Sequence, residues 1–232
     1  MLFRSAVDEF VALMSRAVRL ILFLILPLVA LGIALRGPAT TVLFNHGKFT
    51  AESADLVAAT LLVLLLALPG EGLLTILVRA FYANQDTRTP ALAAILAVVL
   101  NVVIGAFALY VLGWGLAGIA AGIAVGSTVE ATVLALVLRR QIPAFDPRVI
   151  VTAAAPVLVA SLAGGLVAAA VVAILDAGLA GLSTQGRALV ELLVGGGLGG
   201  LAYLVLARVL RLPELGLIMR IMSDTLSRLR PA

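Results

Sequence analysis

The chain has 232 residues, of which 63% are hydrophobic and only 12% charged, and its mean hydropathy is +1.22. A soluble domain is only about half apolar, so this composition excludes an ordinary soluble fold. The net charge is +4 and cysteine is absent, which excludes a disulfide framework and a thiolate metal site. The apolar runs are unbroken and aromatic residues make up only 5%, which favours membrane helices over a membrane β-barrel.

Six apolar stretches are long enough to cross a bilayer as helices. In chain order they lie near residues 18–35, 54–82, 90–112, 116–138, 149–175 and 188–210. We therefore predict an all-α, polytopic transmembrane bundle of about six spans within residues 16–211. We interpret the first stretch as a retained helix, because no small-residue cleavage site follows it before the next spans.

Two flanking segments are expected outside this bundle. Residues 212–232 form a predicted cytoplasmic tail, in which Glu214–Leu229 carries apolar residues at helical spacing, interrupted by charges. This pattern is typical of an amphipathic helix that lies at the membrane interface. Residues 1–15 are expected to be a weaker interfacial segment of the same kind.

The basic residues predict the orientation of the chain. If the N-terminus faces the cytoplasm, 13 of the 16 Lys and Arg residues fall on that side, and only Arg36, Lys48 and Arg187 fall on the other. Short cytoplasmic connections carry an excess of basic residues, so both ends of the chain are predicted to be cytoplasmic. Two cytoplasmic ends require an even number of spans, in agreement with six.

The connections between the stretches contain turn signals. Gly37-Pro38 is expected to end the first helix. The segment from Asp86 to Pro90 is expected to turn the chain and to start the third helix, with Asp86 as its cap. Arg79 and Arg88 flank this turn and would face anionic headgroups, or they would simply follow the positive-inside rule.

The second stretch contains Pro69-Gly70-Glu71-Gly72 near its middle. Proline removes a backbone hydrogen bond and glycine loosens a helix, so a kink is predicted at Pro69, Gly70 and Gly72. A carboxylate is costly at this depth unless it faces a partner, a watery cavity or the protein interior. Glu71 therefore predicts either a polar pivot for a transported substrate or a packing kink with a protonated or hydrogen-bonded side chain.

Other polar residues within the spans have competing interpretations. Glu130 would line a cavity or extend to the interface, and Asn101 would bind a ligand or, more commonly, bond a neighbouring helix. Glu191 and Arg187 are spaced to pair at the surface of the last span. Glycines at four-residue spacing in the fourth span, and glycine clusters in the sixth, predict close helix packing.

The sequence lacks the common enzyme signatures. It has no phosphate-binding glycine loop, no His-Glu-x-x-His and a single histidine, His46. We therefore predict no catalytic residue, no metal and no cofactor. Membrane transport or a structural role remains.

Two motifs resemble a known family. They are Leu43–Thr50, with the sequence LFNHGKFT, and Phe81–Pro90, with the sequence FYANQDTRTP. Together with Leu26-Pro27 they resemble the MurJ (MviN) lipid II flippases of the multidrug/oligosaccharidyl-lipid/polysaccharide exporter superfamily. The resemblance implies that this chain corresponds to the last six of about fourteen helices. It also implies a lipid-linked peptidoglycan precursor as substrate, the missing N-terminal helices as partners and the bacterial inner membrane as location.

The resemblance also implies a central cationic cavity that is lined largely by the preceding helices, whereas this chain has no Lys or Arg between Lys48 and Arg79. Two alternatives therefore stay open beside a lipid II flippase. One is an exporter of another polyprenyl-linked glycan in the same superfamily. The other is a truncated membrane scaffold that does not transport. The residues expected to serve substrate binding or conformational change are Glu71, Arg79, Asp86, Arg88, Asn101 and Glu130.

Overall fold

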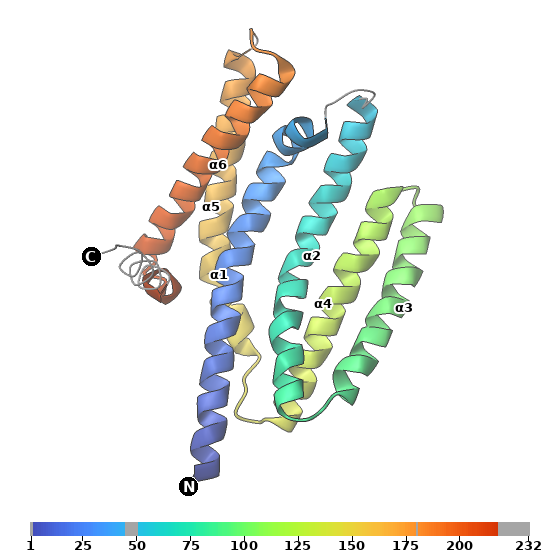
Figure 1. Cartoon of the computed structure of the whole chain (residues 1–232), viewed down its shortest axis with the longest axis vertical. Coiled ribbons are helices and arrows are strands. Elements are labelled where there is room, and N and C mark those ends of the chain that lie inside the picture. The colour runs from blue at the N-terminus through green and yellow to red at the C-terminus, as the bar shows by residue number, and fades with distance from the viewer. Residues whose placement is uncertain (1, 45–50, 180, 218–232) are drawn as a thin grey trace, which may run out of the picture.

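The computed structural model describes residues 2–44, 51–179 and 181–217, and these contain six long helices (Figure 1). They are α1 (Leu2–Phe44), α2 (Ala51–Ala83), α3 (Arg88–Tyr110), α4 (Leu116–Gln141), α5 (Arg148–Gly178) and α6 (Thr184–Val209). Each of the six is long and apolar enough to cross a membrane. The prediction of an all-α bundle with six spans is thus confirmed.

The helices form a row whose order differs from their order in the chain (Figure 1). Helix α3 packs against α4, α4 packs against α2, and α2 packs against α1, which in turn contacts α5 and α6. Although α2 and α3 are joined by a short turn, they barely touch, because α4 lies between them for most of their length. Helix α4 is therefore the link between the α3 end of the row and α2.

Helix α1 is longer than expected. It continues through Pro27 and Pro38 to Phe44, so the expectation that Gly37-Pro38 ends the first helix is wrong. Side chains supply hydrogen bonds around the second proline: the Arg36 guanidinium donates to the Ile33 carbonyl at 2.8 Å, and the Thr40 hydroxyl donates to the Gly37 carbonyl at 2.9 Å. At its other end α1 begins at Leu2, so residues 2–15 are helical and continuous with the first span.

Close packing between α3 and α4 depends on the predicted glycine pattern. A methyl group on Gly118 would come within 2.9 Å of the Ala108 backbone, and one on Gly126 would come within 2.9 Å of the Ala97 carbonyl. At Gly122 a methyl group would collide with the backbone carbonyl of Asn101. These three positions place the two backbones in direct contact, as small residues do in membrane helix pairs.

A second close contact joins α5 to α6. Gly164 faces Gly199, and a methyl group on either would lie 2.7 Å from the carbonyl oxygen of the other. Gly165 faces α1, where a methyl group would lie 3.0 Å from the Ala30 carbonyl. Helices α1, α5 and α6 therefore form a tightly packed trio, beside the α3–α4 pair.

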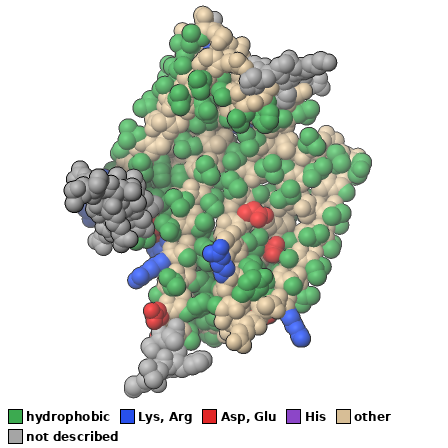
Figure 2. All heavy atoms as spheres, in the orientation of Figure 1, with side chains coloured by type: hydrophobic (Ala, Val, Ile, Leu, Met, Phe, Trp, Pro, Cys, Tyr) green, Lys and Arg blue, Asp and Glu red, His purple; other side chains and the backbone are tan. Residues whose placement is uncertain are grey.

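Most of the surface is hydrophobic, and the basic side chains gather toward one end of the molecule (Figure 2). In the described residues that end carries the α2–α3 turn, the α4–α5 connection and the basic last turn of α4, with Arg139 and Arg140. This placement suits the predicted cytoplasmic location of the turn, which stays a prediction. Of the predicted amphipathic tail only residues up to Leu217 are described, and Leu212 and Leu215 pack against α1, α5 and α6.

Candidate functional site

The turn between α2 and α3 is organised by one carboxylate. One oxygen of Asp86 accepts hydrogen bonds from the backbone nitrogens of Arg88 and Thr89, at 3.1 and 3.0 Å. Its other oxygen accepts from the Thr89 hydroxyl at 2.6 Å and from the Gln141 side-chain amide at 2.7 Å. Asp86 thus caps the first backbone nitrogens of α3 from the position before its N-cap residue, Thr87, and it also ties the turn to the last residue of α4.

These hydrogen bonds change the acidity of Asp86. The Thr89 hydroxyl, the Thr89 backbone nitrogen and the Gln141 amide together lower the pKa of this carboxyl group from 3.8 to about 2. Asp86 therefore stays ionised throughout the neutral range. Arg79 and Arg88, the two basic residues expected near this turn, both have exposed side chains.

Three of the predicted residues meet elsewhere, around a mid-bundle cavity of about 200 Å³ between α2, α3 and α4, midway along these helices. Glu71 of α2, Asn101 of α3 and Glu130 of α4 all line it, together with Ser127. Figure 2 shows acidic side chains midway along this face, over α2 and α4, surrounded by hydrophobic ones. The structure thus separates the predicted residues into two groups, one at this cavity and one around the turn, where α2 ends about three helical turns beyond Glu71.

The glycines beside Glu71 serve packing on two sides of α2. A methyl group on Gly70 would lie 3.1 Å from the Thr128 backbone nitrogen of α4, and one on Gly72 would collide with Ile25 of α1. Helix α2 runs from Ala51 to Ala83 with Pro69 inside it, so the hydrogen-bonded helix is not broken at this point. The small residues therefore let α2 approach both neighbours, while Glu71 between them remains exposed.

Asn101 belongs to the contact between α3 and α4 as well as to the cavity. Its side-chain oxygen would lie 2.8 Å from a methyl group on Gly122, so the amide fills the space that this glycine leaves. Asn101 thus lies in the helix contact and also lines the cavity, so both interpretations of this residue stay predictions. Carboxylates and one amide around a small cavity can hold water, protons or hydrogen-bond donors of a ligand.

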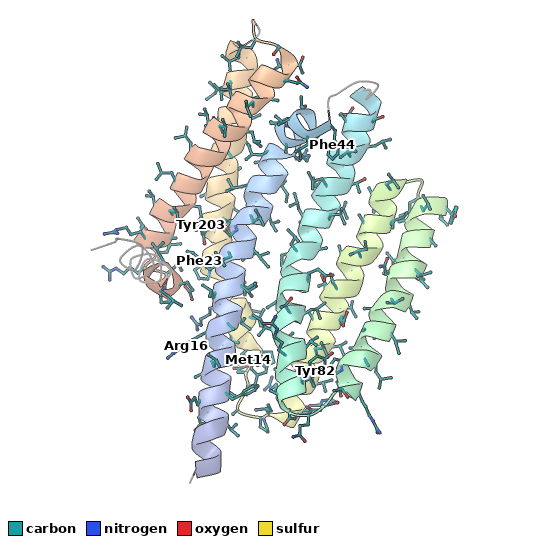
Figure 3. All side chains as sticks on the ribbon, viewed as in Figure 1. Met14, Arg16, Phe23, Phe44, Tyr82 and Tyr203 are labelled. Atoms are coloured by element: carbon teal, nitrogen blue, oxygen red, sulfur yellow. The ribbon has the colours of Figure 1, made fainter. Side chains whose placement is uncertain are left out.

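Large side chains fill the bundle between this cavity and the end that carries the α2–α3 turn. Leu77 and Phe81 of α2, Leu134 and Leu138 of α4, and Phe145 of the α4–α5 connection are each at most 1% exposed. Met14 of α1 completes this cluster, and Figure 3 shows it on the side of α1 that faces α2. Sequence reasoning missed Phe145, because a single aromatic residue between two prolines carries no periodic signal.

At the opposite end the structure corrects one expectation. Arg187 does contact Glu191, with 3.6 Å between Nε and Oε1, but the Glu191 side chain is only 7% exposed and is not on the surface. Arg187 also reaches Asp176 of α5 at 2.9 Å. The spacing of Arg187 and Glu191 on α6 predicted their contact, whereas the burial of Glu191 depends on the neighbouring helices α1 and α5.

Comparison with known proteins adds a family assignment to this geometry. Residues 4–184 match the family model described as lipid II flippase MurJ. Over 95 residues, 41% of this chain and 18% of the relative, the chain is 36% identical to the probable lipid II flippase MurJ of Rhizobium meliloti. Over 87 residues, 38% of this chain and 17% of the relative, it is 37% identical to the lipid II flippase MurJ of Burkholderia cenocepacia.

A solved structure shares the fold. It is described as lipid II flippase MurJ in an inward closed conformation, and it matches 87% of this chain with a TM-score of 0.64 at 20% sequence identity. The match covers 39% of that protein, and the sequence matches cover about a fifth of the curated relatives. The chain therefore corresponds to a part of the length of these proteins.

Proposed function

The chain belongs to the MurJ family of lipid II flippases, and from this premise we propose that it forms part of a flippase for a polyprenyl-diphosphate-linked peptidoglycan precursor. The observation that carries this proposal is the family match over residues 4–184, joined to the shared fold of the solved relative. We further propose that it acts in the bacterial cytoplasmic membrane, with both ends of the chain on the cytoplasmic side. Residues 212–232 would then form an interfacial tail on that side.

The arrangement of the helices supports a transport role. Two tightly packed groups, α3 with α4 and α1 with α5 and α6, are joined through α2. Alternating access requires rigid groups of helices that rock against each other around a polar site. Pro69, Gly70 and Gly72 lie on the connecting helix, next to the cavity that Glu71, Asn101 and Glu130 line. We propose that this part of α2 is the pivot of the movement.

The charge distribution bears on how the substrate is held. A diphosphate requires cationic partners, and no Lys or Arg occurs between Lys48 and Arg79 in this chain. We therefore propose that the preceding helices of the family architecture supply most of these cations and are the partners of this chain. Arg79 and Arg88, exposed near the α2–α3 turn, would meet the anionic headgroup as it enters from the cytoplasm.

This role involves no bond making or breaking. A flippase changes the side of the membrane on which its substrate lies, so it needs binding groups and two conformations rather than a nucleophile and a base. We accordingly propose transport rather than an enzymatic reaction, without a cofactor.

The proposal is tested by measuring the side of the membrane on which lipid II lies. The chain is depleted in the cells that make it, and lipid II on each leaflet is quantified by its accessibility to an externally added enzyme. Accumulation on the inner leaflet is the expected result. An unchanged lipid II distribution with loss of a different polyprenyl-linked glycan would favour the related exporter, and no change in any lipid-linked glycan would favour a scaffold.

A further inference from the structure

A polar cavity lies between α1, α2, α5 and α6, at the end of the bundle opposite the α2–α3 turn. It has a volume of about 280 Å³ and adjoins a second cavity of about 670 Å³, with which it shares Gly37, Pro38, Asp55, Ala58 and Val172. Its polar lining includes Thr41, Asp55, Asp176, Thr184, Arg187 and Glu191. None of these residues belongs to the site proposed above.

Glu191 is the unusual member of this lining. The residue is 6% exposed, and its Oε1 atom has no hydrogen-bond partner. Arg187 approaches that atom only to 3.6 Å, because its guanidinium is directed to Asp176 at 2.9 Å. A desolvated carboxylate oxygen without a donor is costly, so the arrangement suits a donor that is brought by a ligand.

The balance of charge indicates the sign of that ligand. Among the described residues that line the cavity, Asp55, Asp176 and Glu191 bring three carboxylates against the single guanidinium of Arg187. The adjoining cavity adds Arg36, whose guanidinium donates to the Ile33 carbonyl at 2.8 Å. The lining keeps an excess of negative charge even with Arg36 included.

The backbone of α1 adds further acceptors. Pro38 has no N–H, so the carbonyl of Ala34, four residues earlier, lacks the helical donor it would otherwise have. Ala34 lines the adjoining cavity. The hydroxyls of Thr40 and Thr41 both donate to the Gly37 carbonyl, so their hydrogens are already used. The combined cavity therefore adds backbone acceptors to its three carboxylates, and its charged donors are the guanidinium groups of Arg36 and Arg187.

We propose that this cavity binds a primary ammonium group on the peptide part of the translocated precursor. An ammonium presents three N–H donors and one positive charge, which match a carboxylate and nearby acceptors. The described residues contain no group of three acidic or histidine side chains placed to hold a metal ion, so a bare metal cation fits less well. This inference rests on the proposed function for the identity of the ligand, and it assigns the cavity to a lysine-type side chain.

The test uses the purified chain of 232 residues in lipid nanodiscs and the synthetic peptide Ala-Glu-Lys-Ala-Ala. Thermal unfolding is followed through the single tryptophan, Trp114, at increasing peptide concentration. The peptide is expected to raise the unfolding temperature, and the same peptide acetylated on its lysine amine is expected to have no effect.

Glu191→Gln should weaken the apparent affinity for the peptide about tenfold, because it removes a charge-assisted contact. Glu9→Gln, an exposed change in the first part of α1, should leave the affinity unaltered.

Several results would overturn the proposal. These are an equal effect of the acetylated peptide, unaltered affinity in Glu191→Gln, or the same stabilisation by sodium chloride at matched ionic strength. Asp176→Asn repeats the measurement if Glu191→Gln does not fold. Absent peptide binding together with normal lipid II translocation would refute this inference alone and leave the proposed function standing.

Discussion

The hydroxyl of Tyr203 donates a hydrogen bond of 2.7 Å to the backbone carbonyl of Phe23, 180 residues earlier in the chain. In a regular helix that carbonyl would accept from the nitrogen of residue 27, which here is proline and has no N–H. The Tyr203 ring packs on the Phe23 ring, with centroids 5.4 Å apart (Figure 3). A side chain of α6 thus replaces a backbone donor missing from α1, and this fixes the two helices to each other.

Replacing Tyr203 by phenylalanine should destabilise the bundle. The variant keeps the ring contact and leaves the Phe23 carbonyl without its donor, at a cost of about 1 kcal/mol. We expect a lower unfolding temperature in detergent. The double variant Tyr203→Phe with Pro27→Ala restores a backbone N–H at residue 27. Its unfolding temperature should therefore fall less than that of Tyr203→Phe alone. An equal drop in the unfolding temperature of the double variant would show that the Tyr203 hydroxyl does not replace the donor missing at Pro27.

Gly122→Ala should separate α3 from α4. The added methyl group collides with a backbone carbonyl, that of Asn101, which cannot move aside as the end of a side chain could. Overpacking of this kind costs about 1–3 kcal/mol, measured as a drop in unfolding free energy. Gly197→Ala is the matched control, because nothing lies within 4 Å of its added methyl group. Equal effects of the two changes would contradict the close contact.

Glu71→Gln should lower lipid II translocation if the mid-bundle cavity takes part in transport. The change keeps the shape of the side chain and removes a carboxylate at the cavity that Glu130 also lines. A loss of about tenfold is expected, the size of one charge-assisted contact. The measurement is the rate of lipid II transfer between leaflets, with Glu9→Gln as the control for the loss of one negative charge. Full activity in Glu71→Gln would make this residue purely structural.

Acid should weaken the link between Asp86 and Gln141. The folded protein holds the pKa of Asp86 at about 2, below the ordinary 3.8, so ionised Asp86 stabilises the fold. Its contribution is complete above about pH 4 and disappears as the pH falls through the folded pKa near 2. Comparing the unfolding temperature of the wild type and Asp86→Asn between pH 2 and 6 should show a difference that shrinks toward pH 2. A difference independent of pH would mean that the charge does not matter.

The side chain of Gln141 holds the α2–α3 turn against the end of α4. Gln141→Leu removes the amide that donates to Asp86 and the oxygen that accepts from Asn84 at 3.3 Å. Asp86 still accepts hydrogen bonds from the backbone nitrogens of Arg88 and Thr89 in this variant. Gln141→Leu should therefore lose only a part of the stability that Asp86→Asn loses. A cysteine pair at residues 84 and 141 should restore the lost part by joining the same two elements covalently.

Parts of the candidate site could be predicted from local sequence. The cap by Asp86 followed from its place before Thr87-Arg88-Thr89-Pro90, because capping acts over three residues. Glu71 and Glu130 stand out in the sequence because carboxylates are rare in apolar stretches. Their meeting at one cavity depends on the register of α2 against α4, which is set by Gly70 against Thr128 and cannot be seen in either stretch alone.

The number of helices, their approximate places and the concentration of basic residues in alternate connections were determined by the sequence itself, because hydropathy and charge act on each segment separately. The order of the helices in the row, the burial of Glu191 and the bond from Tyr203 to Phe23 were decided only by the tertiary structure. Apolar helices lack a strong hydrophobic preference for particular neighbours within a membrane, so their partners are chosen by small residues and hydrogen bonds that must fit across two helices at once.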